Sequence, residues 1–299
     1  MKRACIILNE TAGQATGIKD RLAPFVREYW CEFSAKREGE SAEGHARRVV
    51  DEGFERIVVA GGDGTLSHVV NGIAADLACV ELGLIPLGTG NDFARSLEIP
   101  LDPIAAVAIA LGDHVRAVDL LRVTNGKAFY AVNAASGGMA GKVAADVMDA
   151  DKVTWGAFAY WMTALSQLVD LKATEVHLDF DEQKLDLEVY GVVIANGRYV
   201  GGGFPIASQA ALDNGKLSIV VIPVLSTLEL LSAGLNYTLG SPSPTGPIKT
   251  FETTRVHLTS KPAMHFSIDG EPTREVEATF EVVPGALRMA VGPMLASSP

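Results

Sequence analysis

The sequence predicts a two-domain α/β protein, in which an N-terminal α/β domain with a parallel sheet precedes a β-rich domain. In the first 120 residues, short apolar runs alternate with stretches of helical periodicity, which is typical of a parallel sheet covered by helices on both faces. From about residue 115 onward, many apolar runs alternate with polar residues, as half-buried antiparallel strands do. The length of 299 residues also favours two domains over one.

The elements of the first domain are expected in alternating order. Continuous apolar runs predict buried strands at 4–8, 56–60 and 82–86. Apolar residues at helical spacing predict helices at 17–30, where Pro24 could disturb the helix, and at 40–52, 65–76, 91–97 and 103–112.

The rhythm changes near residue 115, where a β-hairpin is expected because Asn125-Gly126 separates two β-rich runs. The two domains are expected to join near residues 115–125. Further strands are predicted at 175–180, 185–195, 216–222, 253–259, 263–269 and 278–283, with helices at 155–171 and 227–239 and a loop at 240–247. We place the first domain at residues 1–120 and the second at 121–286. The last segment, about 287–299, could pack back on the first domain and make it discontinuous.

Charge and cysteine content exclude some functions. Acidic residues outnumber basic residues by 36 to 25, giving a net charge of −11, which argues against non-specific nucleic-acid binding. The same charge gives no attraction to an anionic membrane, so any membrane contact must be local or transient. Cys5, Cys31 and Cys79 cannot all pair and lack zinc-ligand spacing, which favours a reduced, cytoplasmic compartment. The apolar stretch 155–171 falls short of the roughly 20 residues of a membrane span, so we expect a soluble protein.

A glycine-rich turn, GGDGT at 61–65, follows a predicted strand and opens a predicted helix. Glycines leave room for an anion to approach the backbone, and the N–H groups and positive end of the next helix favour negative charge. In open α/β sheets, ligands bind at this end of the strands. The turn is therefore a candidate phosphate cradle, although a tight turn without a ligand is the alternative.

Two features favour a ligand at this turn. Asp63 would repel a bare phosphate, but it fits a nucleotide that is accompanied by Mg²⁺ or by a hydrogen-bond network. A second turn, Gly88-Thr89-Gly90, follows the next strand, and Asn91 and Asp92 could cap the helix after it. The two turns could clasp one triphosphate. No lysine follows the glycines as in a Walker loop, and the spacing does not match a dinucleotide fingerprint.

GGDGT at 61–65 together with PLGTGNDFAR at 86–95 resembles the diacylglycerol-kinase catalytic family, which includes sphingosine kinases and bacterial lipid kinases. The first motif alone is shared with NAD kinases. The resemblance continues through 193–222 and the FSIDGEP motif at 266–272, covers nearly the whole chain, and is strongest to bacterial lipid kinases of the YegS type. It implies a nucleotide held between an α/β domain and a C-terminal β-sandwich, with ATP and Mg²⁺ as cofactors.

The resemblance also assigns residues. Nucleotide contacts would come from Asn9, Thr11, Ser34, Gly61, Gly62, Asp63, Gly64, Thr65, Leu66, Ser67 and Thr89. Asp63 and Asp92 would join the acidic network that organises the catalytic Mg²⁺, and Glu271 would be the general base. Considered alone, the Asp-Gly-Glu sequence is more typical of a hairpin turn.

Some residues depart from the family pattern. Ser67 and His68 stand where relatives usually carry Asn-Glu, and His68 is expected to be a surface or interdomain residue. The resemblance implies a structural metal site at Ala211, Asn214 and Lys216, the first and third acting through their carbonyls. An asparagine in place of the usual carboxylate weakens the case for Mg²⁺ there.

The resemblance predicts an ATP- and Mg²⁺-dependent lipid kinase that acts on a hydroxyl of phosphatidylglycerol or diacylglycerol. Its lipid substrate would be met in a peripheral and transient contact at the membrane surface. The alternatives are a kinase of a soluble acceptor such as NAD, and a non-catalytic nucleotide- or lipid-binding module. Apolar residues at helical spacing in the predicted helix 155–171 could line an acyl-chain cleft or form ordinary core: Trp155, Phe158, Met162, Leu165 and Val169.

Overall fold

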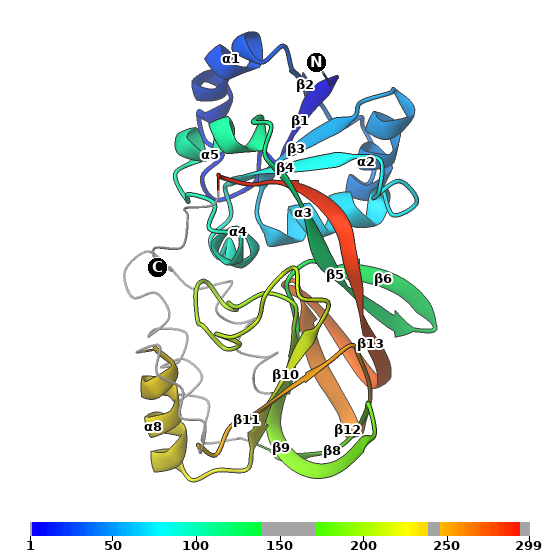
Figure 1. Ribbon diagram of the computed structural model, residues 1–299, viewed down its shortest axis with the longest axis vertical. Helices are drawn as coiled ribbons and strands as arrows, with labels where there is room; N and C mark the ends of the chain where they lie inside the picture. Colours follow the sequence, from blue (N-terminus) through cyan, green and yellow to red (C-terminus); the bar gives the residue numbers. More distant parts are fainter. Residues whose placement is uncertain (1, 139–171, 239–245, 294–299) are drawn as a thin grey trace. The chain divides into compact units, whose positions relative to one another are not determined.

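The computed structural model describes residues 2–138, 172–238 and 246–293 (Figure 1). The chain divides into two compact units: unit 1 is Met1–Val118 with Gly285–Pro299, and unit 2 is Asp119–Pro284. The boundary falls inside two strands, β5 (Val115–Asn125) and β13 (Glu271–Ala290). This two-domain architecture agrees with the predicted fold class.

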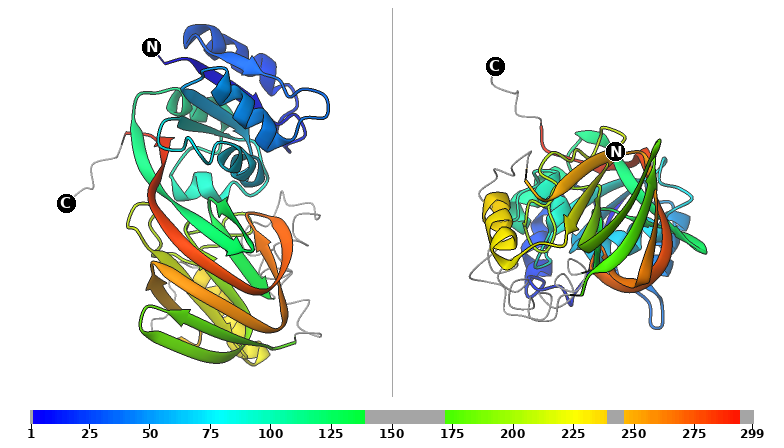
Figure 2. Two further views of the ribbon diagram at one scale, coloured as in Figure 1. Left: turned by 90° about the vertical axis from the view of Figure 1, so that its right-hand side faces the viewer. Right: turned by 90° about the horizontal axis from the view of Figure 1, so that it is seen from below.

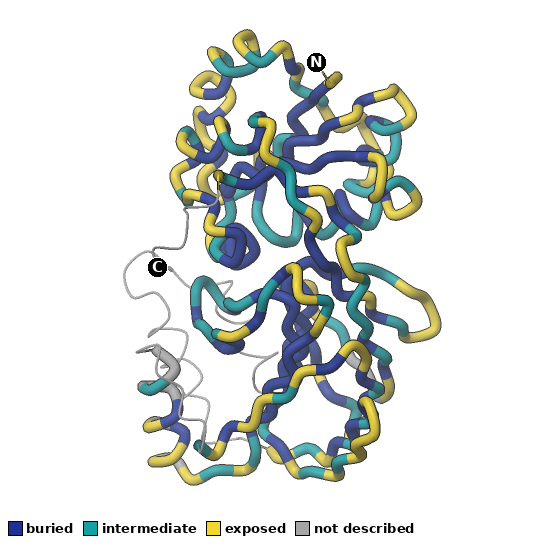
Figure 3. The backbone as a smooth tube through the Cα atoms, viewed as in Figure 1, coloured by how far each residue is buried: buried dark blue, intermediate teal, exposed yellow. Residues whose placement is uncertain are grey.

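Unit 1 contains a parallel sheet in the order β2-β1-β3-β4-β13. Its complete strands are β1 (Ala4–Leu8), β2 (Glu32–Ser34), β3 (Arg56–Gly61) and β4 (Glu81–Pro86). The strands β3 and β4 are buried throughout, as Figure 3 shows, which explains their continuous apolar sequence. The end of β13 joins the edge of this sheet, where Arg288 pairs with Glu81 of β4.

Helices cover both faces of this sheet (Figures 1 and 2), as predicted. They are α1 (Ile18–Glu28), α2 (Ala42–Asp51), α3 (Asp63–Gly72), α4 (Asp92–Ser96) and α5 (Pro103–Ala110). Alternate strand residues such as Ile6 and Val58 share a core with Ile18 of α1 and Val107 of α5. Intervening strand residues such as Ile57 point to the opposite face, where α2 and α3 pack together.

Unit 2 is built from antiparallel strands and parts of β5 and β13. Its complete strands are β6 (Lys127–Ala131), β7 (Ala134–Gly138), β8 (Thr174–Phe180), β9 (Gln183–Ala195), β10 (Leu217–Pro223), β11 (Lys249–Thr253) and β12 (Arg255–Ile268). Both β7 and β8 pair with β9 on one side and β12 on the other. The sheet curls on itself, because Val123 of β5 and Ile219 of β10 share one core (Figure 2).

A second core lies on the other face of β9 and β10. There α8 (Thr227–Thr238) contributes Leu230, and the segment between β9 and β10 contributes Phe204 and Ile206. These side chains pack against Val193 and Val220 of the sheet. Unit 2 is therefore a sheet packed on both faces.

Several predicted elements differ from those observed. The two strands predicted at 253–259 and 263–269 form one strand, β12, whose pairing with β13 shifts register between Thr259 and Met264. The run predicted at 278–283 and the final apolar segment both belong to β13. The short strands β2 and β7 were not predicted, because three residues and a Gly-rich run carry little periodicity.

Other predictions concern the membrane and the segments that the structure does not describe. Within the described residues, no helix is long and apolar enough to cross a membrane. The helix predicted at 155–171 and most of the loop at 240–247 lie outside the described residues. The hairpin predicted at Asn125-Gly126 is confirmed, since β5 and β6 pair across it.

Candidate functional site

The two glycine turns lie in contact at the carboxyl ends of β3 and β4. Because these strands are parallel neighbours, their turns begin side by side, and the Leu87 N–H donates to the Gly61 carbonyl at 2.9 Å. A β carbon on Gly88 would lie 2.7 Å from the Cα atom of Gly62, which is closer than side chains can pack. Glycine is therefore required where the two backbones meet.

Asp63 joins the two turns through hydrogen bonds. Its Oδ2 accepts the backbone N–H of Asp92 at 2.9 Å, and its Oδ1 accepts that of Phe93 at 3.0 Å. These N–H groups belong to the first turn of α4, which offers them no partner within the helix. A carboxylate at the start of α3 thus caps the helix after the neighbouring strand.

The side chain of Asn91 does not cap α4, as the sequence had suggested it could. Asn91 occupies the N-cap position of α4 with a φ of 51°, but its side chain makes no cap hydrogen bond. Instead, its Oδ1 accepts the Gly88 N–H at 2.9 Å and its Nδ2 donates to the Gly88 carbonyl at 2.7 Å. Its side chain closes the second glycine turn and leaves the helix N–H groups to Asp63.

Asp63 and Asp92 place two carboxylates at the start of α4. Burial raises the pKa of the Asp63 carboxyl, while the N–H groups of Asp92 and Phe93 and the charge of Arg95 act in the opposite direction. Within the described ranges, no three His, Cys, Asp or Glu side chains gather as a metal site. Mg²⁺ that binds with a nucleotide typically needs only one or two carboxylates besides phosphate oxygens and water. Each Asp63 oxygen accepts one N–H and keeps a second lone pair, so a metal role for Asp63 and Asp92 is compatible with these contacts.

Asn9 connects the loop after β1 to the first glycine turn. Its Nδ2 donates to Thr65 Oγ1 at 2.9 Å. Its Oδ1 accepts both the backbone N–H of Thr11, at 3.1 Å, and the Thr11 hydroxyl, at 2.7 Å. The structure therefore brings together three residues that the sequence had assigned to one ligand.

A pocket of about 490 Å³ opens beside these residues, entirely within unit 1. Four predicted nucleotide contacts line it: Asn9, Thr11, Ser34 and Thr65. Two lysines and two histidines that sequence reasoning had not assigned to a ligand line it as well: Lys19, Lys36, His45 and His68. The pocket lies at the carboxyl ends of parallel strands, where open α/β sheets bind ligands. Its two lysines favour an anion, although Glu10 also lines it.

Other predicted contacts have different environments. Thr89 is exposed on the second turn, and a β carbon on Gly13 would lie 3.7 Å from its Oγ1, so the loop after β1 also approaches this turn. Leu66 is fully buried, and its N–H donates to the Gly62 carbonyl at 3.1 Å. His68 lies half-exposed on α3. Its Nδ1 atom is 2.5 Å from Glu43 Oε1, and this contact joins α3 to α2.

In unit 2, Glu271 follows a tight hairpin turn. Ile268 pairs with Glu271 across Asp269 and Gly270, whose φ angles of 47° and 94° fit a two-residue turn. Asp269 accepts three backbone N–H groups, from Val132 at 2.6 Å, Asn133 at 2.9 Å and Ala134 at 3.2 Å.

The Asp269 contacts anchor the turn and leave Glu271 exposed at its end. Sequence reasoning singled out Glu271 and missed the anchoring role of Asp269. The aspartate two residues before Glu271 in the same motif was the available signal.

The loop at Ala211, Asn214 and Lys216 is held by hydrogen bonds of its own. Asn214 Oδ1 accepts the Lys216 N–H at 3.0 Å, and the Gly215 N–H donates to Asp119 Oδ2 at 2.7 Å. Lys216 Nζ pairs with Glu252 at 2.8 Å. An uncharged side-chain oxygen that already has a donor is a weak ligand for Mg²⁺.

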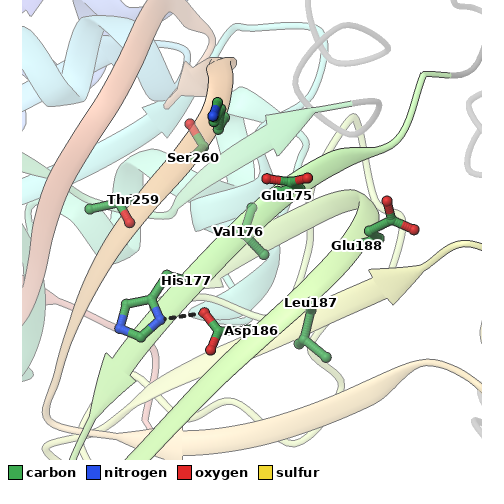
Figure 4. A pocket seen from close by; sticks show the side chains of 9 residues that line it. Glu175, Val176, His177, Asp186, Leu187, Glu188, Thr259 and Ser260 are labelled. Atoms are coloured by element: carbon green, nitrogen blue, oxygen red, sulfur yellow. Dashed lines mark hydrogen bonds and ion pairs between the residues drawn. The ribbon is translucent and has the colours of Figure 1, made fainter.

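A second hollow, of about 410 Å³, lies on the outer face of β8, β9 and β12 (Figure 4). In it, His177 Nδ1 lies 2.7 Å from Asp186 Oδ1, and Glu175 stands opposite Glu188 in the strand register. None of the predicted site residues lines it. Its charged side chains are those of a solvated sheet face.

Comparison with known proteins gives two family matches. Residues 3–123 match the family described as Diacylglycerol kinase catalytic domain. Residues 133–291 match the family described as YegS C-terminal NAD kinase beta sandwich-like domain.

Curated relatives cover most of the chain. A "Probable lipid kinase YegS-like" of Pseudomonas aeruginosa strain UCBPP-PA14 is 35% identical over 271 residues, covering 86% of this chain and 85% of that protein. A "Diacylglycerol kinase" of Staphylococcus haemolyticus strain JCSC1435 is 30% identical, covering 93% and 85%. The crystal structure of a diacylglycerol kinase from Bacillus anthracis str. Sterne has a similar fold, with a TM-score of 0.77, 22% identity and coverage of 99% and 98%.

Proposed function

The chain belongs to the diacylglycerol kinase catalytic family, and on that premise we propose that it transfers the γ-phosphoryl group of ATP to a lipid hydroxyl. The observation that carries the proposal is the carboxyl edge of the unit 1 sheet. There a pocket lined by Lys19 and Lys36 adjoins the first of two touching glycine turns. Such an edge suits a polyphosphate, because backbone N–H groups, a helix N-terminus and cations all favour its charge.

The proposed contacts divide between the pocket and the turns. Asn9, Ser34 and Thr65 would bind the nucleotide from the pocket wall, and Gly62 and Thr89 would contact its phosphates from the turns. Asp63 and Asp92 would hold a Mg²⁺ ion, which would supply positive charge close to the phosphates during transfer. The rigid link from Asp63 to α4 would keep these groups in place before the nucleotide binds.

Glu271 would be the general base. A lipid hydroxyl is a poor nucleophile, and a carboxylate can accept its proton as the phosphoryl group is transferred. Its exposure and its place beside the anchored Asp269 turn support this role. The carboxylate would be presented in a fixed orientation while remaining open to an acceptor.

The acceptor is proposed to be phosphatidylglycerol or diacylglycerol, met in a peripheral and transient contact with a membrane from the cytoplasm. The names of the Pseudomonas and Staphylococcus relatives support a lipid. A soluble acceptor such as NAD is the second candidate, favoured by the description of the C-terminal domain as NAD kinase-like.

Transfer of labelled phosphate would test the function. We expect purified protein with γ-labelled ATP and Mg²⁺ to label phosphatidylglycerol or diacylglycerol in mixed micelles, and EDTA to stop the reaction. Labelling of NAD but of neither lipid would favour the second candidate. Nucleotide binding without transfer to any acceptor would indicate a non-catalytic module, and no nucleotide binding would overturn both kinase proposals.

Asp63→Ala is expected to weaken binding of ADP with Mg²⁺ by about tenfold or more and to lower the free energy of unfolding by about 1–3 kcal/mol. The substitution removes a carboxylate and leaves two N–H groups of α4 without their acceptor. Calorimetric titration and urea unfolding measure the two effects.

Asp63→Asn is the matched variant, because it keeps one acceptor oxygen but loses the charge. It should recover part of the stability and little of the metal-dependent affinity. An alanine variant as stable as the unaltered protein would contradict the capping role. An asparagine variant with full affinity would contradict the metal role.

A further inference from the structure

Ser34 and His45 form a polar pair in the wall of the unit 1 pocket. Ser34 ends β2, and His45 lies near the start of α2, the helix that follows. Ser34 Oγ and His45 Nε2 are 2.8 Å apart, a normal hydrogen-bond length. His45 is only 3% exposed, whereas Ser34 is half-buried, so a ligand in the pocket meets Ser34 more readily than the imidazole ring.

The surroundings of His45 favour its neutral form. Burial lowers the pKa of His45, and the charge of Arg48 lowers it further. Lys36 also lowers the pKa of His45, whereas Glu40 and Glu52 raise it without reversing the net shift. Three further titratable residues line the same pocket: Glu10, Lys19 and His68. At pH 7.5 the ring therefore carries one N–H donor and one nitrogen acceptor.

The hydrogen bond can run in two directions. If Nε2 accepts the Ser34 proton, the serine presents only lone pairs to the pocket. If Nε2 carries the proton and donates it to Ser34 Oγ, the serine hydroxyl can point its own hydrogen into the pocket. A polyphosphate offers only acceptor oxygens, so an anionic ligand favours the second arrangement.

We propose that His45 is a positioning residue that donates through Nε2 to Ser34 and so directs the serine hydroxyl at an oxygen of a bound nucleoside polyphosphate. The inference rests on the proposed function for the class of ligand. No motif in the sequence indicates this role. His45 would act on the ligand only through Ser34.

A double-mutant cycle would test the role with ADP and Mg²⁺ at pH 7.5. We expect Ser34→Ala and His45→Leu each to raise the dissociation constant about tenfold, as loss of one hydrogen bond can do. The double variant should bind no more weakly than Ser34→Ala, because the histidine acts through the serine. Additive losses would overturn the inference.

Conservative variants separate positioning from folding. His45→Gln can place an amide N–H near the Nε2 position and should bind ADP within about twofold of the unaltered protein, whereas the shorter His45→Asn should behave like His45→Leu. His177→Leu, in unit 2, is a control that should leave affinity unchanged. Thermal unfolding identifies any variant that fails to fold. If His45→Leu does not fold, the ADP affinities of Ser34→Ala and His45→Gln test the inference.

The ring nitrogens provide an independent readout. Nitrogen-15 NMR at pH 7.5 with ADP and Mg²⁺ bound should show the proton of His45 on Nε2. A proton on Nδ1, or unchanged ADP affinity in Ser34→Ala, would overturn the inference while leaving the kinase proposal standing. Failure of the unaltered protein to bind ADP would instead overturn the proposed function on which the inference rests.

Discussion

Glu271→Gln is expected to lower the rate of phosphoryl transfer by about 10²- to 10⁴-fold, the usual contribution of a general base. Glutamine has nearly the same shape but cannot accept the proton of the lipid hydroxyl. Nucleotide affinity should stay nearly unchanged, because the proposed nucleotide contacts all belong to unit 1. Single-turnover assays with labelled ATP and calorimetric titration of ADP would measure the two quantities.

The neighbouring part of β13 offers a matched control. Glu277 is another exposed carboxylate of the same strand and pairs with His257, so Glu277→Gln should keep the full transfer rate. If Glu271→Gln retained the unaltered rate, the base would have to be another residue. A loss of ADP affinity equal to the loss of rate would also contradict the assignment.

Glu81→Ala is expected to lower the free energy of unfolding by about 3–5 kcal/mol, the usual effect of removing one partner of a buried ion pair. Glu81 is buried in β4 and accepts hydrogen bonds from Arg56 Nη2 at 2.6 Å, Arg288 Nη2 at 2.9 Å and Lys2. Arg56 is buried too, so without Glu81 its charge would stay uncompensated. Urea unfolding monitored by circular dichroism would measure the loss.

Acid should produce a related effect. Burial acts to raise the pKa of Glu81, but hydrogen bonds from Lys2, Arg56 and Arg288 outweigh it and hold the pKa at about 2, against an ordinary value of 4.5. A lowered pKa stabilises the fold above pH 4.5, and this contribution of about 3 kcal/mol is lost as the pH falls towards 2.

Two variants would check the origin of the acid effect. Glu81→Gln should flatten the pH dependence of stability between pH 4.5 and 2. Arg288→Ala removes a partner whose side chain is 47% exposed and should cost much less than Glu81→Ala. Equal losses for Glu81→Ala and Arg288→Ala would show that the buried Arg56 is not the reason.

Local sequence patterns accounted for most of the fold. The glycine turns, the parallel strands and the Asn125-Gly126 hairpin were predictable because each depends on neighbouring residues. The continuity of β12 was not predictable. Its sequence contains two separate alternating runs, which one strand accommodates through a register shift between Thr259 and Met264.

The same distinction between local and long-range features applies to the candidate site. Its motif residues were predictable, but the partners that hold them were not. Asp63 caps a helix that starts 29 residues later, and Asp269 accepts N–H groups of a loop 137 residues earlier in the chain. Such contacts depend on which strands become neighbours, and single-residue propensities do not carry that information.

The return of residues 285–290 to the edge of β4 has a practical consequence for protein production. A clone that stops near residue 118 would omit the segment carrying Arg288 and expose the hydrogen-bonding edge of β4, which invites aggregation. A minimal version of the first unit should instead join residue 118 to residue 285 through a short flexible linker.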